Sequence, residues 1–415
     1  MTTDETCRAA KAAAGELALL TRARKDDALH HIAEALERRF DEILRDNAED
    51  LRLARQSRLP ETLIDRLLLD EERLRDAIRS VRRVAALDDP VGEVVRGWRL
   101  ENGMDVRQVR VPLGVVAVIY ESRPAVTVDA AALCLKSGNA VILRGGAAAK
   151  HSNRILAEVI EGAVLESGLA ARSVSHLSPD REELLELLRC RDAVDVIIPR
   201  GGADLLEYLV AHSHIPLLYA AGGNCHVYVD SAADLDKAHA IVVNAKCQRP
   251  GTGNAAETLL VHQRVAATLL PQLLQELDRR GVEMAVDKAT TTLIEGLQLK
   301  RANRSHYETE FMALKLAVRV VNSLEEALEH IAAYGSGHSE AIVTEDAVAA
   351  RTFLRRVDAA CVYVNASTRF TDGAEFGFGA EIGVSTQKLH ARGPIGVREL
   401  TCTKYEIWGD GQVRS

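Results

Sequence analysis

The turn at residues 249–254 is a place where reactive side chains and exposed backbone donors could meet. The surrounding stretch, 244–262, reads Asn-Ala-Lys-Cys-Gln-Arg-Pro-Gly-Thr-Gly-Asn-Ala-Ala-Glu-Thr-Leu-Leu-Val-His. It runs from the apolar residues 240–243 through a polar turn into β-like residues at 258–261. A turn with Arg, Pro, Gly and Asn between buried segments is typical of loops that present backbone N–H groups and reactive side chains. An ordinary surface connection is the alternative interpretation.

Arg123 is a second candidate, because it follows the apolar run 115–119 within Tyr-Glu-Ser-Arg-Pro. In α/β sheets, ligands bind at the carboxyl ends of the strands. A guanidinium group suits a phosphate or a carboxylate. The position predicts contact with an anionic substrate, with a surface salt bridge as the alternative.

Two Arg-Gly-Gly turns also follow strand-like runs, Arg144-Gly145-Gly146 and Arg200-Gly201-Gly202. Glycines after a buried strand permit close approach of a ligand, and Arg144 could face a ribose or a 2′-phosphate. The GxGxxG fingerprint is absent from the sequence. Residues 251–256 mimic its spacing but precede a strand, whereas the fingerprint requires a strand, a turn and then a helix.

The elements that position these residues alternate between strand and helix. Residues 1–95 read as helical, with Leu29, Ile32, Leu36, Phe40 and Ile43 predicted on one face. Residues 94–111 predict a hairpin around Asn102-Gly103, and 400–408 predict a further strand. Apolar, β-branched runs predict strands, and the segments between them predict helices. The predicted strands are 115–119, 140–143, 194–198, 227–229, 257–262, 341–344 and 361–365. The predicted helices are 124–137, 150–167, 181–190, 265–279 and 324–333. This alternation predicts an α/β fold with a doubly wound parallel sheet followed by another α/β unit.

Length and composition indicate an ordinary soluble protein with two or three domains. The chain has 415 residues, a net charge of −8, 47% apolar and 27% charged residues, which indicates neither disorder nor a nucleic-acid or anionic-membrane surface. No apolar run reaches the roughly 18–20 residues that span a bilayer, and no signal peptide is expected. Seven cysteines without paired spacing indicate reduced thiols and a cytoplasmic protein.

The stretch 244–262 resembles the nucleophile loop of the γ-glutamyl phosphate reductases, a branch of the aldehyde dehydrogenase superfamily. That branch reads Asn-Ala-Lys-x-Gln-Arg-Pro-x-x-Cys-Asn, and this chain matches every fixed position except the cysteine, which is Gly253. The block 363–394 is the longest near-intact match, and the resemblance extends over residues 8–413. It implies an aldehyde-dehydrogenase-like fold with a cofactor domain (1–97 and 112–230), a catalytic domain (231–397) and a β-arm for homo-oligomerisation (98–111 and 398–415).

The same resemblance implies roles for individual residues. Gly253, at the family's nucleophile position, and Asn254 belong to the catalytic loop. The residues implied for NADP(H) are Arg144, Gly145, Gly146, Arg200, Gly201, Gly202, Glu310 and Phe311. Those implied for the substrate, γ-glutamyl phosphate, are Arg123, Asn365, Ser367, Thr368 and Arg369. No metal ligand set is expected. Departures from the family pattern accompany Gly253 at Ala125, Ala148, Ala220, Ala221 and Lys315.

Glycine cannot serve as the thiol nucleophile, and three explanations stay open. Cys247, six residues upstream, could be a substitute thiol. Gly253 could be an engineered change or a sequence error. The chain could also be a repurposed paralogue, which the other departures favour.

The function implied is NADPH-dependent reduction of L-glutamate 5-phosphate to L-glutamate 5-semialdehyde in proline biosynthesis, by a cytoplasmic oxidoreductase. The alternative is a thiol-less paralogue or pseudoenzyme. Such a protein would bind the glutamyl substrate or the nucleotide, or would partner the glutamate kinase, without reductase activity.

Overall fold

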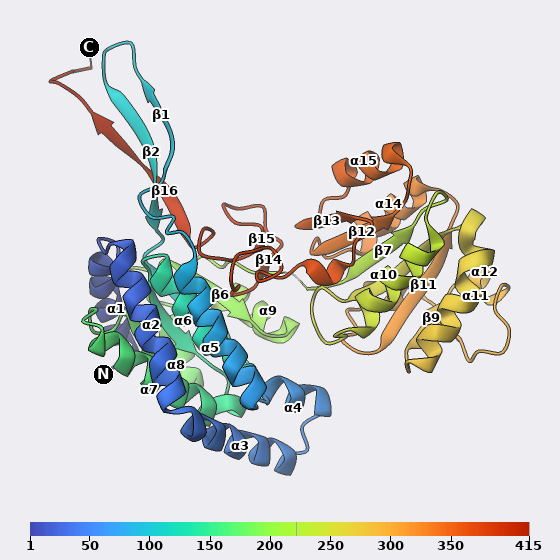
Figure 1. The fold of residues 1–415 in the computed structure, drawn as a ribbon, viewed down its shortest axis with the longest axis horizontal. Helices are drawn as coiled ribbons and strands as arrows, with labels where there is room; N and C mark the ends of the chain where they lie inside the picture. Colours follow the sequence, from blue (N-terminus) through green and yellow to red (C-terminus); the bar gives the residue numbers. More distant parts are fainter. Residues whose placement is uncertain (221, 415) are drawn as a thin grey trace. The chain divides into compact units, whose positions relative to one another are not determined.

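The computed structural model consists of two compact units and describes residues 1–220 and 222–414. For Thr62 it describes the backbone alone. Unit 1 consists of residues 1–219, 377–383 and 394–415, and unit 2 of residues 220–376 and 384–393. Their helices and strands are labelled in Figure 1. Their division into a cofactor domain, a catalytic domain and an oligomerisation arm stays a prediction.

Unit 1 begins with five helices, and the first and the fifth start at capping side chains. Thr2 and Glu5 form a capping box at the first helix, and the Asp70 side chain accepts from Arg73 N at the fifth. The helices are α1 (Thr3–Leu17), α2 (Arg22–Arg38), α3 (Phe40–Gln56), α4 (Glu61–Leu67) and α5 (Glu71–Ala86). The predicted face is divided, because Leu29, Ile32 and Leu36 lie on α2 whereas Phe40 and Ile43 lie on α3.

A parallel sheet in the order β5-β4-β3-β6 forms the centre of unit 1. Every residue of β3 and β4 is buried, because helices cover both faces of the sheet. The strands are β3 (Val115–Tyr120), β4 (Ala140–Arg144), β5 (Val174–His176) and β6 (Val196–Arg200). The helices between and after them are α6 (Ala125–Lys136), η1 (Ala147–Ala149), α7 (Lys150–Glu166), α8 (Arg181–Leu187) and α9 (Ala203–His212).

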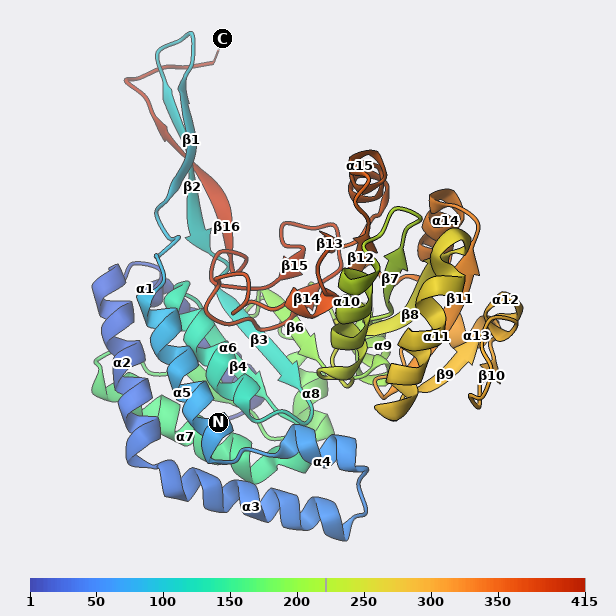
Figure 2. The ribbon, with the colours of Figure 1, turned by 45° about the vertical axis from the view of Figure 1, so that its right-hand side comes forward.

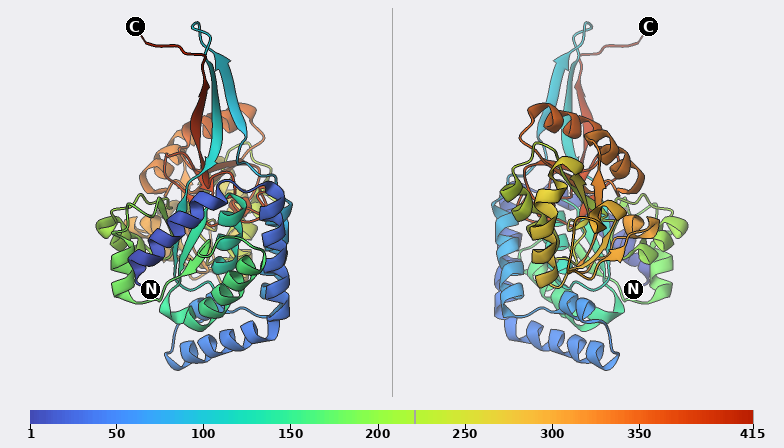
Figure 3. Two further views of the ribbon diagram at one scale, coloured as in Figure 1. Left: turned by 90° about the vertical axis from the view of Figure 1, so that its left-hand side faces the viewer. Right: turned by 90° about the vertical axis from the view of Figure 1, so that its right-hand side faces the viewer.

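A three-stranded antiparallel sheet, β1-β2-β16, projects from the same unit as a long ribbon (Figure 2). The strands are β1 (Val94–Arg99), β2 (Asp105–Pro112) and β16 (Thr401–Trp408). Both views in Figure 3 show the three strands side by side, although β16 lies at the far end of the chain. The predicted hairpin and the predicted C-terminal strand therefore pair with each other.

Unit 2 is built on a seven-stranded sheet in the order β10-β9-β11-β8-β7-β12-β13, in which the neighbouring strands pair in parallel. Its strands are β7 (Cys225–Val229), β8 (Ala256–His262), β9 (Glu283–Val286), β10 (Lys300–Arg301), β11 (Lys315–Val321), β12 (Ser339–Val343) and β13 (Cys361–Val364). Its helices are α10 (Leu235–Cys247), α11 (Gln263–Arg279), α12 (Lys288–Thr291), α13 (Arg304–Glu308), α14 (Leu324–Tyr334), α15 (Ala347–Arg356) and η2 (Thr368–Phe370). The short strands β14 (Val384–Ser385) and β15 (Gly393–Pro394) pair with each other.

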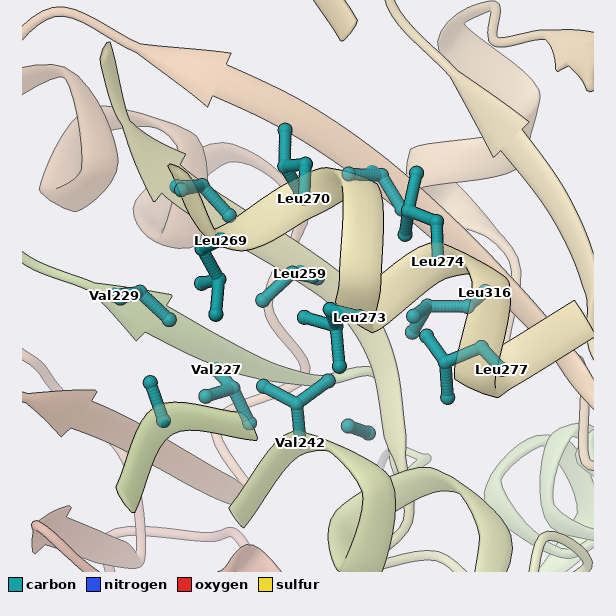
Figure 4. Close-up of a cluster of buried hydrophobic side chains, with 14 of the residues drawn as sticks. Val227, Val229, Val242, Leu259, Leu269, Leu270, Leu273, Leu274, Leu277 and Leu316 are labelled. Atoms are coloured by element: carbon teal, nitrogen blue, oxygen red, sulfur yellow. The ribbon is translucent and has the colours of Figure 1, made fainter. Parts of the chain in front are cut away.

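One hydrophobic cluster of unit 2 lies between this sheet and the helices α10 and α11, and another includes residues of α14 and α15. Figure 4 shows Leu269 and Leu273 of α11 and Val242 of α10 directed toward Val227 of β7 and Leu259 of β8. Because β8 is buried along its whole length, the loop that precedes it is anchored on a rigid strand. The predicted α/β fold with parallel sheets is confirmed.

Candidate functional site

The carboxyl edge of the sheet in unit 1 brings three predicted turns together. Glu121, the first residue after β3, lies between the turns that follow β4 and β6. Its N–H donates to Arg200 O at 3.2 Å, and its carbonyl accepts from Gly146 N at 3.2 Å. The two Arg-Gly-Gly turns are therefore tied to one shared residue.

The side chain of Glu121 lies at the N-terminus of α9. Its Oε2 accepts from Gly202 N at 2.8 Å, and Gly202 is the N-cap of that helix. A Cβ on Gly201 would stand 2.7 Å from Oε2, so only glycine allows this approach. The helix terminus beside Gly201 and Gly202, which are implied for NADP(H), thus holds a carboxylate oxygen of the chain itself.

The glycines after β4 serve a similar packing role. A Cβ on Gly145 would stand 2.0 Å from Asn153 Nδ2, and one on Gly146 would stand 2.7 Å from Glu121 O. Protein atoms therefore already occupy the space beside both glycines. Contact with a ligand at these positions stays a prediction.

Arg144 is directed toward backbone carbonyls before α8. Its Nη2 donates to Pro179 O and, at 3.5 Å, to Asp180 O. The side chain is largely buried, and burial lowers the pKa of the guanidinium. In this structure Arg144 holds the backbone before α8, and its contact with a cofactor stays a prediction.

Arg123 is half-buried in the loop between β3 and α6.

In unit 2, the loop between α10 and β8 is held by the residues that follow β13. The Asn254 amide donates to Thr371 O at 2.9 Å, and its Oδ1 accepts from Arg369 Nη1. Asn254 O accepts from Thr368 Oγ1 at 2.7 Å, and Arg369 Nη1 also donates to Thr252 Oγ1 at 2.9 Å. The structure therefore brings the predicted residues Asn254, Thr368 and Arg369 into one hydrogen-bond network.

Two other predicted substrate residues support the same segment. Ser367 Oγ accepts from Arg369 N at 3.2 Å and begins the turn η2. Asn365 has a positive φ of 54°, and its amide makes two 2.9 Å bonds to the backbone of Thr344. The side chain of Asn365 thus joins the ends of β12 and β13.

Gly253 lies beside a backbone contact that requires a second glycine. A Cβ on Gly223 would stand 1.9 Å from Gly253 O, so residue 223 must lack a side chain. Cys225, two residues further on, donates its Sγ to Gly253 O at 3.2 Å. Burial is the main cause that raises the Cys225 pKa well above its ordinary value, so its sulfur stays a thiol.

The space beside Gly253 would accept a side chain. A Cβ built there meets His338 Nε2 at 3.6 Å, Glu310 Oε1 at 3.8 Å and Gly223 Cα at 3.9 Å, which are ordinary contacts. Cysteine at this position would place its sulfur beside an imidazole and a carboxylate. Phe311, next to Glu310, is half-buried.

His338 is oriented by a chain of hydroxyl groups. Its Nδ1 lies 2.8 Å from Ser339 Oγ, which lies 2.6 Å from Thr371 Oγ1, and Tyr363 OH lies 2.7 Å from the same Thr371 oxygen. The imidazole is 5% exposed. Since Nδ1 is engaged with Ser339, the other ring nitrogen is the one that faces residue 253.

Cys247, the predicted substitute thiol, ends α10. It packs against the hydrophobic cluster of unit 2, and its charged neighbours include Arg280 and Glu276. Burial is the largest cause that raises its pKa. The thiol that adjoins Gly253 is that of Cys225.

A buried ion pair supports the segment that carries Glu310. Lys246 and Glu257 are fully buried, with Nζ and Oε2 2.6 Å apart, and Glu257 Oε1 accepts from Met312 N at 3.2 Å. Burial raises the pKa of Glu257 to about 7, against the opposing effect of Lys246. The pair thereby ties residues 310–312 to the start of β8.

Comparisons with known proteins agree with this architecture. The pattern described as Aldehyde dehydrogenase family matches residues 1–309. Gamma-glutamyl phosphate reductases of Moorella thermoacetica and Thermobifida fusca are 53% and 52% identical over 406 residues, which cover 98% of this chain and 97% of each relative. The chain belongs to the aldehyde dehydrogenase family.

Solved structures extend the comparison to the fold. The crystal structure of gamma-glutamyl phosphate reductase from Thermotoga maritima has a TM-score of 0.95 and 44% identity, and each chain covers 100% of the other. An acetylating aldehyde dehydrogenase from Geobacillus thermoglucosidasius shares the fold, with a TM-score of 0.71, 18% identity and coverage of 100% of this chain and 97% of that one. The predicted resemblance to the γ-glutamyl phosphate reductase branch, and with it the assignment to an oxidoreductase family, is confirmed.

The aldehyde dehydrogenase family uses a nicotinamide cofactor. In unit 1, the Gly202 N–H at the N-terminus of α9 is the kind of donor that binds a cofactor phosphate, and in this structure the Glu121 carboxylate accepts from it. Among the described residues, no cluster of His, Cys, Asp or Glu suits a metal ion, and no helix is long and apolar enough to cross a membrane.

The neighbours of residue 253 were not identified from the sequence. It gave no role to His338 or Cys225, and it did not link the Lys246–Glu257 pair to the site. These residues lie on separate elements of unit 2, and no spacing in the sequence links them. Among the departures from the family pattern, Ala221 lies outside the described residues.

Proposed function

We propose that this chain binds L-glutamate 5-phosphate and reduces it with NADPH to L-glutamate 5-semialdehyde and phosphate, in proline biosynthesis. Relatives about 50% identical over nearly the whole chain carry the name of that reductase. The geometric support is the hydrogen-bond network of Asn254, Thr368 and Arg369 around the loop at residue 253.

In this proposal, the substrate's anionic groups are bound by cations and hydroxyl groups. Arg123 and Arg369 supply guanidinium groups, and Ser367 and Thr368 supply hydroxyl groups, while Asn365 fixes their turn. NADPH supplies the hydride when it is bound. The residues proposed to hold it are Arg144, Gly145, Gly146, Arg200, Gly201, Gly202, Glu310 and Phe311.

The difficulty for this proposal lies at Gly253, which cannot form a thioester. In a protease, removal of the nucleophile costs about 10⁶-fold in turnover, and a residual rate remains from binding and oxyanion stabilisation. We therefore expect wild-type reduction to be slow. Because a Cβ at residue 253 meets nothing closer than 3.6 Å, Gly253→Cys is compatible with the fold and should restore the rate.

The same glycine favours a second candidate function. The chain would then be a repurposed paralogue that binds the glutamyl substrate or the nucleotide, or a glutamate kinase, without reducing the substrate.

One assay separates the two candidates. The reverse reaction, from semialdehyde, phosphate and NADP⁺, is followed at 340 nm for wild type, Gly253→Cys, Cys247→Ser and Cys225→Ser. Activity in wild type that is lost in one cysteine variant identifies a displaced thiol and supports the reductase. Activity in Gly253→Cys alone supports the paralogue, and NADPH titration of the wild type then tests whether it still binds the cofactor.

We also propose a homo-oligomeric, cytoplasmic protein whose contacts between copies involve the β1-β2-β16 sheet. The support is the exposure of apolar side chains on this sheet, including Trp98, Tyr405, Ile407 and Trp408.

A further inference from the structure

We propose that this chain, with Gly253, hydrolyses the acyl phosphate by means of a water molecule placed where the family has its thiol. This inference rests on the proposed function, because the substrate is the same γ-glutamyl phosphate. It adds a second reaction, the hydrolysis of an acyl phosphate to a carboxylate and inorganic phosphate.

The first step of the argument is the space at residue 253. The point that a Cβ would occupy has His338 Nε2 at 3.6 Å and Glu310 Oε1 at 3.8 Å as its nearest neighbours. A water oxygen that shifts by roughly 1 Å from this point reaches hydrogen-bond distance of either group. A bound water needs two or more polar partners, and the imidazole and the carboxylate are the polar groups nearest to this point.

The second step is the orientation of His338. Its Nδ1 is 2.8 Å from Ser339 Oγ, within the hydroxyl chain that continues to Thr371 and Tyr363. When Nδ1 donates its proton to Ser339 Oγ, Nε2 carries a lone pair and faces residue 253. An imidazole held in this way is suited to act as a general base toward a water molecule.

The third step compares the water with the neighbouring thiol. The Cys225 thiol is fully buried, and its Sγ is engaged with Gly253 O at 3.2 Å. Burial of the sulfur disfavours the thiolate that nucleophilic attack requires. Water is therefore the nucleophile that this geometry favours.

The reaction balances without an oxidant or a reductant. The water oxygen forms a bond to the acyl carbon, and the water proton passes to His338 Nε2. The bond between the acyl carbon and the phosphate oxygen breaks, and phosphate leaves with the electron pair. The products are glutamate and inorganic phosphate, and no hydride is transferred.

Isotope labelling tests the proposal on the full-length wild-type chain. Glutamate kinase, glutamate and ATP generate γ-glutamyl phosphate in H₂¹⁸O without NADPH, and mass spectrometry measures ¹⁸O in the γ-carboxylate of glutamate. Attack at carbon labels glutamate, whereas attack at phosphorus labels phosphate, and cyclisation to 5-oxoproline leaves glutamate unlabelled. We expect labelling at least tenfold above the reaction with the kinase alone.

Variants locate the reaction. Gly253→Ala fills the proposed water position with a methyl group in ordinary contact, and His338→Gln removes the base, so each should lower labelling at least tenfold. The matched control is Gly162→Ala in α7, where an added Cβ meets nothing within 4 Å, and it should label as wild type does. Thermal unfolding of all variants checks that the fold is retained.

The outcomes separate this inference from the proposed function. Glutamate labelling that depends on Gly253 and His338 supports hydrolysis. No labelling by wild type, with reduction by Gly253→Cys, overturns hydrolysis and leaves the substrate assignment intact. No labelling together with an inactive Gly253→Cys overturns both. Labelling that Gly253→Ala and His338→Gln do not change overturns the proposed site.

Discussion

At the scale of residues, the buried Lys246–Glu257 ion pair is the feature near the site with the largest expected effect on the free energy of unfolding. Removal of one partner from a buried ion pair leaves an uncompensated group and typically costs about 3–5 kcal/mol. We expect Lys246→Met to lower the free energy of unfolding by that order, as measured by urea denaturation. Glu257→Gln in the same chain should recover part of the loss, because the amide still accepts from Met312 N. A loss below about 1 kcal/mol in Lys246→Met would contradict this interpretation.

The lowered pKa of His330 predicts that the free energy of unfolding depends on pH. Its pKa is lowered to about 3, mainly by burial and then by His226 and Arg319, and its Nδ1 lies 2.8 Å from Arg319 Nη1. Since the pKa of His330 in the folded state lies below the ordinary value near 6.5, the unfolded state takes up a proton first as pH falls. The contribution of neutral His330 to the free energy of unfolding is therefore complete above about pH 6.5. It is lost progressively as pH falls toward 3.

Chemical denaturation at pH 7.5, 6 and 5 measures this effect against His330→Gln. We expect wild type to lose more unfolding free energy than the variant on acidification, by up to about 1.4 kcal/mol per pH unit below pH 6.5. Parallel pH profiles for the two proteins would exclude His330 as the source.

Residue types at the site were predictable where the motif was continuous in sequence. Asn254, Thr368 and Arg369 came from two such motifs, and the structure joins them by hydrogen bonds. The contact of Cys225 and His338 with residue 253 depends on how strands β7, β8 and β12 align in the sheet. No local pattern carries that alignment.

At the scale of elements, the N-terminus of α9 is the feature with the clearest consequence. The Glu121 carboxylate would compete with a cofactor phosphate for Gly202 N–H. We expect Glu121→Gln to bind NADPH several-fold more tightly, as measured by fluorescence titration, because the competing charge is removed. Glu182→Gln, in the first turn of the separate helix α8, is the matched control. Weaker binding in Glu121→Gln would show that the carboxylate supports the cofactor instead.

Strands made of long apolar runs were predicted well, and weakly apolar or edge elements were not. The runs at 115–119 and 140–143 correspond to β3 and β4, which are buried throughout. The strand predicted at 194–198 contains buried apolar residues, but β6 begins only at Val196. The strands β9 and β10 were missed, since they are short and β10 is an exposed edge strand of two charged residues.

At the scale of the whole molecule, the β1-β2-β16 sheet should decide the oligomeric state. Ile407 is 59% exposed in the single chain, so a charge there should leave the fold of one chain intact. We expect Ile407→Lys to reduce the molar mass measured by light scattering, because a lysine in an apolar contact must be desolvated. Glu406→Gln, the neighbouring residue on the same strand, is the control. An unchanged mass in Ile407→Lys would place the contacts elsewhere.

The pairing of β2 with β16 also has a consequence for synthesis on the ribosome. Pro112 pairs with Thr401, so the outer edge of β2 has no partner until residues 401–408 have been translated, about 290 residues later. Such an open edge is prone to pair with other chains. Nascent chains released early, before β16 has emerged, would therefore expose this edge and be the most susceptible to aggregation.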